Sequence, residues 1–422
     1  MKRRQFLHAA GASAFLAGCA SINGQAKPHV VVIGGGYGGA TAARYIRLWS
    51  DNGIDVTLIE PNAQFISCPL SNLVLGGSRQ IGDLSFSINA LADQHGVRIV
   101  RDLVTSINAD KRTVALATGQ TLNYDRLIVS PGVDFLWDQL PGMRKPDAQD
   151  AILHAWKAGP QTTALRAQLE AMPDGGVYAM TIPPAPYRCP PGPYERASQI
   201  AFYFSRHKPK SKVLILDAND DVVSKGPLFK KVWKDRYNGI IDYRPSFRTA
   251  DVDATTRTAI SELGDKVQAD VLNVIPPQRA GSIAVQSGLA NVNARWCGVD
   301  FLTFESTQVK NIHVLGDAIA VAPLMPKSAH MANQHAKVCA AAVVDLLSDR
   351  APYDQPMLTN TCYSFVSDQD VIHVASVHAY NAEKKTLLVV SGSGGVSSGP
   401  SALEGEYAMN WARNIWADTL GS

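Results

Sequence analysis

Several motifs that would assign a chemistry at once are missing from this sequence. No two cysteines are spaced as CxxC, and no CxxCH segment occurs in the 422 residues. The first spacing is typical of structural zinc sites and of thioredoxin-like redox centres, and the second attaches a c-type haem. We therefore expect neither a metal site nor a haem on this chain.

A strong charge imbalance is missing too. The 40 Lys and Arg residues nearly balance the 37 Asp and Glu residues, which leaves a formal net charge of +3. Binding to nucleic acid usually needs a strongly basic face. The composition therefore predicts no nucleic-acid partner.

No apolar run is long enough to span a bilayer, which takes roughly 20 residues. The longest candidate, Phe6 to Ala17, follows the pair Arg3–Arg4, and this pattern predicts a twin-arginine export signal and a periplasmic protein. Two interpretations of Leu16 to Cys19 stay open. It has the shape of a lipoprotein cleavage box, in which Cys19 would become a lipid tether to the membrane, and it also suits an ordinary small-residue cleavage site.

Short apolar runs separated by helical stretches predict an α/β protein with two Rossmann-like units. The first unit begins with strands at 29–33 and 56–60 around a helix at 40–48. The second has strands at 177–182 and 212–217 around a helix at 194–207, and another helix is expected over 147–172. After Pro352 the pattern changes to short strands, such as 387–390, and a terminal helix, which predicts a small α+β domain. The predicted boundaries are a signal segment at 1–26, a first domain at 27–142 resuming at 282–351, a second domain at 143–281, and a C-terminal domain at 352–422.

A glycine motif follows the first strand directly. Gly34, Gly36 and Gly39 form G-x-G-x-x-G between a strand and a helix, and Glu60 ends the next strand. Such glycines let the backbone approach a pyrophosphate, the helix N-terminus favours its negative charge, and the acid can bind ribose hydroxyls. The motif predicts a dinucleotide site.

Later residues favour FAD over NAD in that site. Gly316 and Asp317 follow a short buried strand and precede a long helix, a position from which a carboxylate can meet the ribityl-phosphate side of a flavin. In the second unit, the place of a glycine loop is taken by the proline-rich loop, residues 183–193. Proline is stiff and has no backbone N–H, so it cannot cradle a pyrophosphate. The second unit is therefore expected not to bind NAD(P)H.

The long segment CPPGPYERAS, residues 189–198, resembles the flavoprotein subunit of flavocytochrome c sulfide dehydrogenase. This family lies within the superfamily of sulfide:quinone oxidoreductases and disulfide-reductase-like flavoproteins, and the resemblance extends over the chain that follows the signal. The other matching segments are residues 31–45, 65–77, 153–169, 183–201, 271–283, 313–343, 360–364 and 407–421.

The resemblance implies roles for three cysteines. Cys68 matches the family cysteine that bonds covalently to the flavin, and Cys189 and Cys362 match a pair that forms a disulfide beside the flavin ring. Cys297 and Cys339 match no functional position and are expected to be buried core residues, as free cysteines often are.

Three other residues have two interpretations each. Glu195 matches an acid suggested as a base near the disulfide, but a carboxylate at a helix N-terminus is also simply stabilising. Lys327 precedes the last helix of the first domain and is a candidate flavin contact. Trp411 matches an aromatic residue near the flavin and is equally compatible with a core position.

The function implied by the resemblance is FAD-dependent oxidation of sulfide to zero-valent sulfur or polysulfide at the disulfide, with transfer of electrons to a c-type cytochrome subunit that carries the haem. Two alternatives stay open. One is a sulfide:quinone oxidoreductase, and the other is a non-catalytic binding or assembly protein stabilised by FAD.

Overall fold

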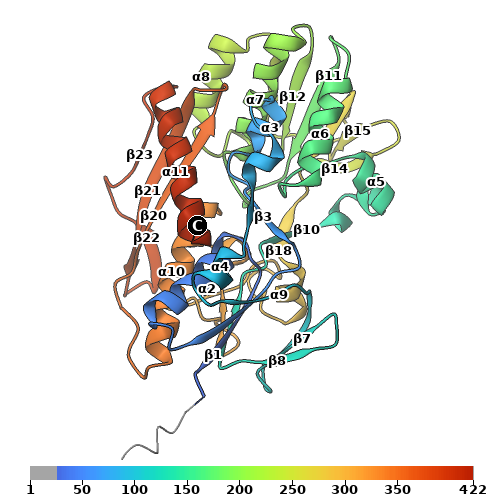
Figure 1. Ribbon diagram of the computed structural model, residues 1–422. Coiled ribbons are helices and arrows are strands. Elements are labelled where there is room, and N and C mark those ends of the chain that lie inside the picture. Colours follow the sequence, from blue (N-terminus) through green and yellow to red (C-terminus); the bar gives the residue numbers. More distant parts are fainter. Residues whose placement is uncertain (1–25, 422) are drawn as a thin grey trace, which may run out of the picture.

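The computed structural model describes residues 26–421, which form two α/β parts and a third part packed beside them (Figure 1). The predicted export signal and Cys19 lie outside the described residues. The two larger parts are each built on a parallel sheet, so the predicted fold class with two Rossmann-like sheets is confirmed.

The first part is a five-stranded parallel sheet packed with two long helices. Its elements are β1 (His29–Ile33), α2 (Tyr37–Trp49), β2 (Asp55–Ile59), β5 (Arg98–Val100), β9 (Arg126–Val129), β19 (Ile312–Val314) and α10 (Ala329–Leu346). The strand order β19-β9-β1-β2-β5 puts β1 in the middle of the sheet. Its apolar side chains are buried on both faces, as is typical of a parallel sheet covered by other elements. Helices α2 and α10 lie against each other, although almost 300 residues separate them in the sequence.

Smaller elements join the strands of this sheet. Between β2 and β5 lie β3 (Gln64–Ile66), α3 (Ser71–Gly76), η1 (Ile81–Leu84), β4 (Ser85–Ser87) and α4 (Ala90–Asp93). An antiparallel sheet of β6 (Val104–Asn108), β7 (Thr113–Leu116) and β8 (Thr121–Asn123) precedes β9. The sequence pattern does not predict this sheet, because its strands are short and only partly buried.

The second part repeats the parallel arrangement with four strands in the order β13-β12-β11-β17. Its elements are α6 (Pro160–Ala171), β11 (Val177–Ile182), α7 (Gly192–His207), β12 (Lys212–Asp217), α8 (Gly226–Arg236), β13 (Ile241–Arg244) and β17 (Val271–Val274). An antiparallel sheet of β14 (Thr249–Asp253), β15 (Thr258–Ser261) and β16 (Lys266–Gln268) lies between β13 and β17 in the sequence. The chain enters and leaves this part through two strands that pair with each other, β10 (Val133–Phe135) and β18 (Gln278–Ala280).

The single helix expected over residues 147–172 is wrong. The structure has α5 (Pro146–Ala151) and α6 separated by an irregular stretch. Pro160 begins α6 at its first position, where a proline fits, and the preceding Gly159 has a φ of 149°, which no helix allows. The side-chain oxygen of Gln161 accepts hydrogen bonds from the backbone N–H groups of His154 and Ala155 and holds the stretch in place.

The third part is a mainly antiparallel sheet covered by the C-terminal helix. Its elements are β20 (Met357–Phe365), β21 (Val371–Asn381), β22 (Thr386–Val389), β23 (Gly395–Val396) and α11 (Ala402–Leu420). Strands β20 and β21 are longer than the short strands expected from the sequence. Helix α11 packs on β21 and on α2 of the first part, and it buries Ala408, Ala412 and Ile415 there.

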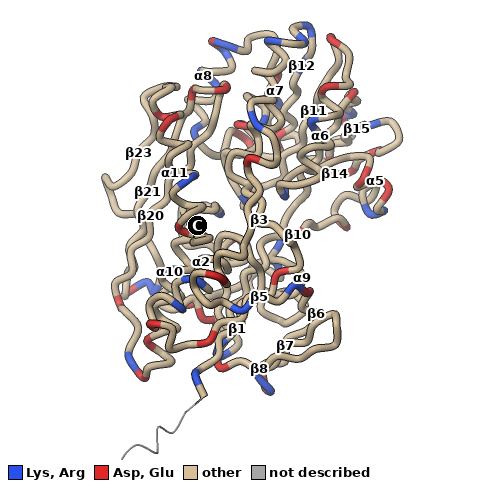
Figure 2. Tube along the Cα trace, viewed as in Figure 1, with Lys and Arg blue, Asp and Glu red and all other residues tan. Residues whose placement is uncertain are grey.

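Short helical turns complete the connections. They are η2 (Trp137–Gln139), η3 (Pro141–Met143), α9 (Ser282–Gln286) and η4 (Gly316–Ala318). No helix within residues 26–421 is long and apolar enough to cross a membrane. Acidic and basic residues are interspersed along all three parts (Figure 2).

Candidate active site

A cavity of about 1320 Å³ lies where the three parts meet. This volume exceeds the roughly 300–1,000 Å³ of an ordinary small-molecule pocket, so the cavity suits a ligand as large as a dinucleotide. Most of the residues predicted from the sequence line it, although they come from six separate stretches of chain. These residues are Gly34, Gly36, Glu60, Cys68, Cys189, Glu195, Gly316, Asp317, Cys362 and Trp411.

The turn between β1 and α2 requires glycine at two positions and leaves space at a third. Gly34 has a φ of 95°, and a Cβ there would lie 2.3 Å from the carbonyl oxygen of Ser130. A Cβ at Gly39 would lie only 1.8 Å from the carbonyl oxygen of Gly34. A Cβ at Gly36 would meet nothing within 4 Å, and Gly36 faces the cavity at the start of α2. The turn therefore leaves open space in front of a helix N-terminus, as a pyrophosphate requires.

Glu60 follows β2 and holds the glycine turn from the other side. Its Oε2 accepts a hydrogen bond of 2.7 Å from the backbone N–H of Gly35, and its Oε1 accepts bonds from the backbone and side chain of Asn62. An ionised carboxylate has about four lone-pair sites. Glu60 can thus hold the loop and still accept a hydrogen bond from a ribose hydroxyl.

Asp317, in the turn η4 after β19, has a polar atom without a partner. Its Oδ1 is buried and accepts no hydrogen bond from residues 26–421. Burial raises the pKa of this carboxyl, and the positive charges of Arg188 and Lys327 act in the opposite direction. Buried polar groups are nearly always hydrogen-bonded, so the free oxygen indicates a ligand with a donor group at this place. Together with the glycine turn and Glu60, it fits an FAD molecule.

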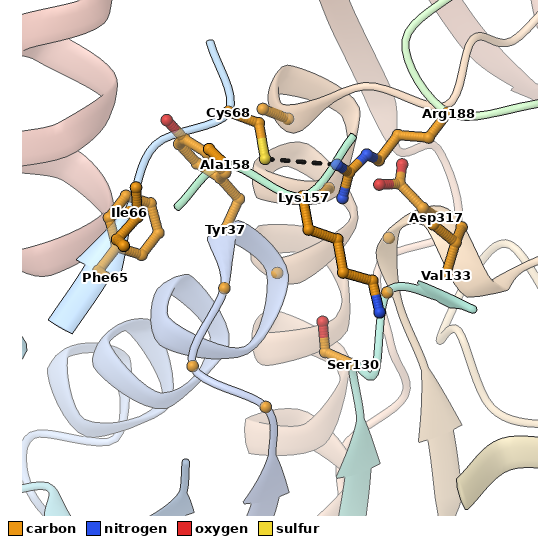
Figure 3. Close-up of a pocket in the computed structure, with 18 of the residues that line it drawn as sticks. Tyr37, Phe65, Ile66, Cys68, Ser130, Val133, Lys157, Ala158, Arg188 and Asp317 are labelled. Carbon is orange, nitrogen blue, oxygen red and sulfur yellow. Dashed lines mark hydrogen bonds between the residues drawn. The ribbon is translucent and has the colours of Figure 1, made fainter. Parts of the chain in front are cut away.

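Cys68 lies on the loop between β3 and α3 and faces Arg188 from the proline-rich loop (Figure 3). The Nη2 atom of Arg188 lies 3.5 Å from the Sγ atom of Cys68 and also donates to the carbonyl oxygen of Trp156. The carboxyl of Asp317 lies on the other side of the guanidinium in the same view. The loop that carries Cys68 is held by Ser67, whose Oγ accepts hydrogen bonds from Tyr37 and Trp416.

Cys189 and Cys362 reach the cavity from different parts of the fold. Cys189 lies in the proline-rich loop with a φ of 58°, and its backbone N–H donates to the carbonyl oxygen of Lys327 at 2.8 Å. Cys362 lies on β20, and Asn360 Nδ2 is 3.5 Å from its Sγ. Burial raises the pKa of both thiols, and a negative charge on Cys362 adds to the rise at Cys189. Both are free thiols in the structure, so the disulfide stays a prediction.

Glu195 lies in the first turn of α7 and is buried. Its Oε1 accepts a hydrogen bond from the backbone N–H of Phe365, and its Oε2 accepts one from Asn72 Nδ2 at 3.0 Å. Burial raises the pKa of this carboxyl, although these hydrogen bonds favour its charged form. The side chain thus connects α7, α3 and β20 beside the cysteines, and its role as a base stays a prediction.

Two predicted cofactor residues do not line the cavity. Gly39 is covered by the turn that it closes. The ammonium of Lys327 points to the carbonyl oxygens of Asp317 and Ile319, and it lies 3.6 Å from the ring centroid of Trp296. The backbone of Lys327 is the part near Cys189, and the flavin contact of its side chain stays a prediction.

Three basic residues near the cavity were not predicted from the sequence. They are the buried Arg196 and Lys225 and the half-buried Arg188, and the acids nearby are the buried Glu195 and the half-buried Asp317. None of the five takes part in a salt bridge within residues 26–421. The only sign of these charges in the sequence is that Arg188 and Arg196 lie close to Cys189 along the chain.

Comparison with known proteins finds family models that match three segments of this chain. Residues 162–276 match the family model "Sulfide dehydrogenase (flavocytochrome c) flavoprotein chain, central", and residues 354–420 match "Flavocytochrome c sulphide dehydrogenase, flavin-binding". Residues 28–168 match "Pyridine nucleotide-disulphide oxidoreductase".

Individual proteins similar to this chain belong to the same group of flavoproteins. The flavoprotein chain of flavocytochrome c sulfide dehydrogenase from Chlorobaculum thiosulfatiphilum is 56% identical over 45 residues, which are 11% of this chain and 92% of that sequence. The mitochondrial sulfide:quinone oxidoreductase of Dictyostelium discoideum is 25% identical over 299 residues, and this chain covers 64% of its length. The crystal structure of sulfide:quinone oxidoreductase from Aquifex aeolicus has the same fold, with a TM-score of 0.75, 17% identity, and coverage of 94% of this chain and 92% of that one.

Proposed function

Because this chain belongs to the flavoprotein family of the flavocytochrome c sulfide dehydrogenases and sulfide:quinone oxidoreductases, we propose that it oxidises sulfide with FAD and passes the electrons to a c-type cytochrome. The product would be zero-valent sulfur or polysulfide. The observation that carries this proposal is the meeting of Cys189 and Cys362, from two different parts of the fold, in the cavity that fits FAD.

The cysteine pair would carry the sulfur chemistry. In the oxidised state Cys189 and Cys362 form a disulfide, and hydrosulfide attacks one sulfur, which breaks the S–S bond and gives a persulfide on one cysteine and a thiolate on the other. A second hydrosulfide takes the outer sulfur away as the hydrogen disulfide ion, HSS⁻. The two cysteines are then reduced, and loss of two electrons closes their disulfide again. The net change is two hydrosulfide ions to one hydrogen disulfide ion, one proton and two electrons.

FAD would accept those two electrons and release them one at a time to a haem. The chain would hold it with the glycine turn at the pyrophosphate, Glu60 at a ribose and Asp317 at the ribityl side, and Cys68 would anchor it covalently. Arg188, between Cys68 and Asp317, adds a positive charge to the same region. Together with Arg196 it would also favour hydrosulfide over neutral hydrogen sulfide inside the cavity.

Features outside the cavity support a cytochrome as the electron acceptor. The sequence has no CxxCH segment, so the haem would belong to a separate cytochrome subunit. A quinone reductase of this family would need an apolar surface for the membrane. Here the apolar face of α11 is covered by α2 and β21, and the helix also carries Glu404, Glu406, Arg413 and Asp418. These features favour the cytochrome.

Cellular location is part of the same proposal. The twin-arginine pattern at Arg3–Arg4 would direct a folded, flavin-loaded protein to the periplasm, and lipidation of Cys19 would tether it to a membrane. A periplasmic location would bring the flavin to c-type cytochromes.

An anaerobic titration tests the function. Sulfide is added to the purified flavoprotein while the flavin absorbance is followed, and then an oxidised c-type cytochrome or a soluble quinone analogue is added. The proposal requires the flavin to bleach with sulfide and to recover faster with the cytochrome. Recovery with the quinone alone would favour the quinone reductase, and a flavin that sulfide does not reduce would leave a non-catalytic FAD protein.

A further inference from the structure

Lys225 is a buried lysine whose ammonium group is hydrogen-bonded to the backbone of Cys362, one member of the cysteine pair. It immediately precedes α8 in a left-handed conformation, with a φ of 57°, and its surface is 7% exposed. Its Nζ donates hydrogen bonds to the carbonyl oxygen of Cys362 at 2.9 Å, to Ser364 Oγ at 2.7 Å and to the carbonyl oxygen of Ile372 at 3.2 Å. All three donor positions of the ammonium are therefore used, and they fix it against β20 and β21.

No carboxylate pairs with this charge. Lys225 forms no salt bridge within the described chain, and its three acceptors are neutral oxygens. A buried charge is costly unless an opposite charge lies nearby. The acidic groups that act on it are, from the largest effect to the smallest, Cys362, Glu195, Cys189 and Glu404. Cys362 is a thiol, and its carbonyl oxygen already accepts a hydrogen bond from the ammonium of Lys225.

The two cysteines differ in their surroundings. Among charged groups, Lys225 has the largest effect in favour of a negative charge on Cys362, and Asn360 can donate a hydrogen bond to that sulfur. Cys189 packs with apolar residues of the second part, and negative charges on Cys362 and Glu195 oppose its ionisation more than Arg188 and Lys225 favour it. Lys225, which is hydrogen-bonded to the backbone of Cys362, therefore offers a counter-charge to the sulfur of Cys362 in preference to that of Cys189.

We propose that Lys225 is a positioning residue that holds Cys362, rather than Cys189, as the thiolate of the opened pair. The proposal rests on the proposed function for the role of the pair, and it assigns to Lys225 the charge that stabilises the sulfur released when the disulfide is attacked. A thiol with a lower pKa leaves faster in thiol–disulfide exchange, so Lys225 would also speed that step. Burial lowers the pKa of Lys225 to about 8, and the ammonium is then still mostly protonated at neutral pH.

Alkylation of the reduced holoprotein tests this inference without sulfide. The protein is reduced with a phosphine, treated with iodoacetamide across a range of pH, and digested, and the modification of Cys362 and Cys189 is measured separately by mass spectrometry. Only the thiolate reacts, so each rate profile gives the pH at which that cysteine ionises. In the wild type, Cys362 is expected to ionise at lower pH than Cys189. The reverse order would overturn the proposal, and this result needs no variant.

Variants then assign the effect to the charge. Lys225→Met is expected to lower the alkylation rate of Cys362 at pH 7.5 by about tenfold or more, which corresponds to one pKa unit, and to change Cys189 less. Lys225→Arg keeps the charge and is expected to restore most of the rate. Lys231→Met, on the exposed side of α8, is the matched control and should leave both profiles unchanged. A Cys362 profile that Lys225→Met does not shift, in protein with wild-type flavin content, would contradict the proposal.

The result is independent of the sulfide titration. Failure of sulfide to reduce the flavin would refute the proposed function and leave the ionisation order measurable. Normal sulfide oxidation with an unchanged Cys362 profile in Lys225→Met would refute only the role of Lys225.

Discussion

The backbone N–H of Cys189 donates a hydrogen bond of 2.8 Å to the carbonyl oxygen of Lys327. Cys189 belongs to the proline-rich loop of the second part, and Lys327 lies just before α10 of the first part. The bond therefore fixes the loop on the part that carries the glycine turn. Because Cys189 also has a left-handed backbone, with a φ of 58°, its position depends on contacts of this kind.

Two glycines of the turn should respond differently to alanine. Gly39→Ala places a Cβ 1.8 Å from the carbonyl oxygen of Gly34, and we expect this overlap to lower the free energy of unfolding by about 1–3 kcal/mol. The gain of roughly 1 kcal/mol in helix propensity is too small to offset a clash with backbone. Chemical denaturation of the variant and the wild type measures the difference.

Gly36→Ala is the matched control, because its Cβ meets no protein atom within 4 Å. We expect its stability to stay within about 1 kcal/mol of the wild type, since only a helix cap changes. Its flavin content should nevertheless fall severalfold, because the methyl group would enter the space for the pyrophosphate. Full flavin content in Gly36→Ala would show that the ligand does not bind at this turn.

Cys68 is expected to hold the flavin covalently. Acid precipitation of the wild-type protein should leave the yellow colour in the pellet, and Cys68→Ala should release it to the supernatant. Cys297→Ala is the control, since Cys297 is fully buried and does not line the cavity. Wild-type protein that loses all its flavin on precipitation would refute the covalent bond.

NADH and NADPH should not reduce the flavin at a useful rate. Besides the proline-rich loop, the acid at the end of β12 is already engaged, because Asp217 accepts hydrogen bonds from Tyr194 at 2.7 Å and from Tyr243 at 3.1 Å. In a nucleotide-binding unit an acid at this place would bind a ribose. Anaerobic mixing with NADH should leave the flavin oxidised for minutes, and bleaching within seconds would contradict this account.

The two repeated α/β parts of the fold could be predicted from the sequence, but only some of the site residues could. Buried strands such as 29–33 and 212–217 have continuous apolar runs, so their positions follow from local pattern. Lys225 and Asn72 could not be found in this way. Their importance comes from contacts with Cys362 and Glu195, residues more than 100 positions away, and no local pattern encodes such contacts.

If Glu195 acts as a base, the direction in which activity changes with pH can be predicted. Burial raises the pKa of this carboxyl, so a base at this place loses activity as the pH falls through the raised value. We expect the ratio of kcat/KM for sulfide between the wild type and Glu195→Gln to decrease at low pH. The ratio removes the effect of sulfide ionisation, which is common to both proteins. A constant ratio across the pH range would leave Glu195 a purely structural role.

The raised pKa of Glu195 should also make the free energy of unfolding depend on pH. A raised pKa in the folded state means that the stabilising contribution is present below the unfolded pKa of about 4.3 and is lost as the pH rises through the folded value. The free energy of unfolding of the wild type should therefore fall relative to that of Glu195→Gln over this window. Denaturant titrations at several pH values measure the difference, and parallel pH curves for the two proteins would contradict the raised pKa.

The most direct test of the central claim is anaerobic flavin reduction by sulfide in Cys189→Ser, Cys362→Ser and the double variant. The account predicts that each single variant loses sulfide-dependent reduction by several orders of magnitude and keeps its flavin, because the cofactor contacts lie on other residues. The double variant should be scarcely worse than either single one, since the two sulfurs act as one unit. Rapid reduction by sulfide in either single variant would contradict the account.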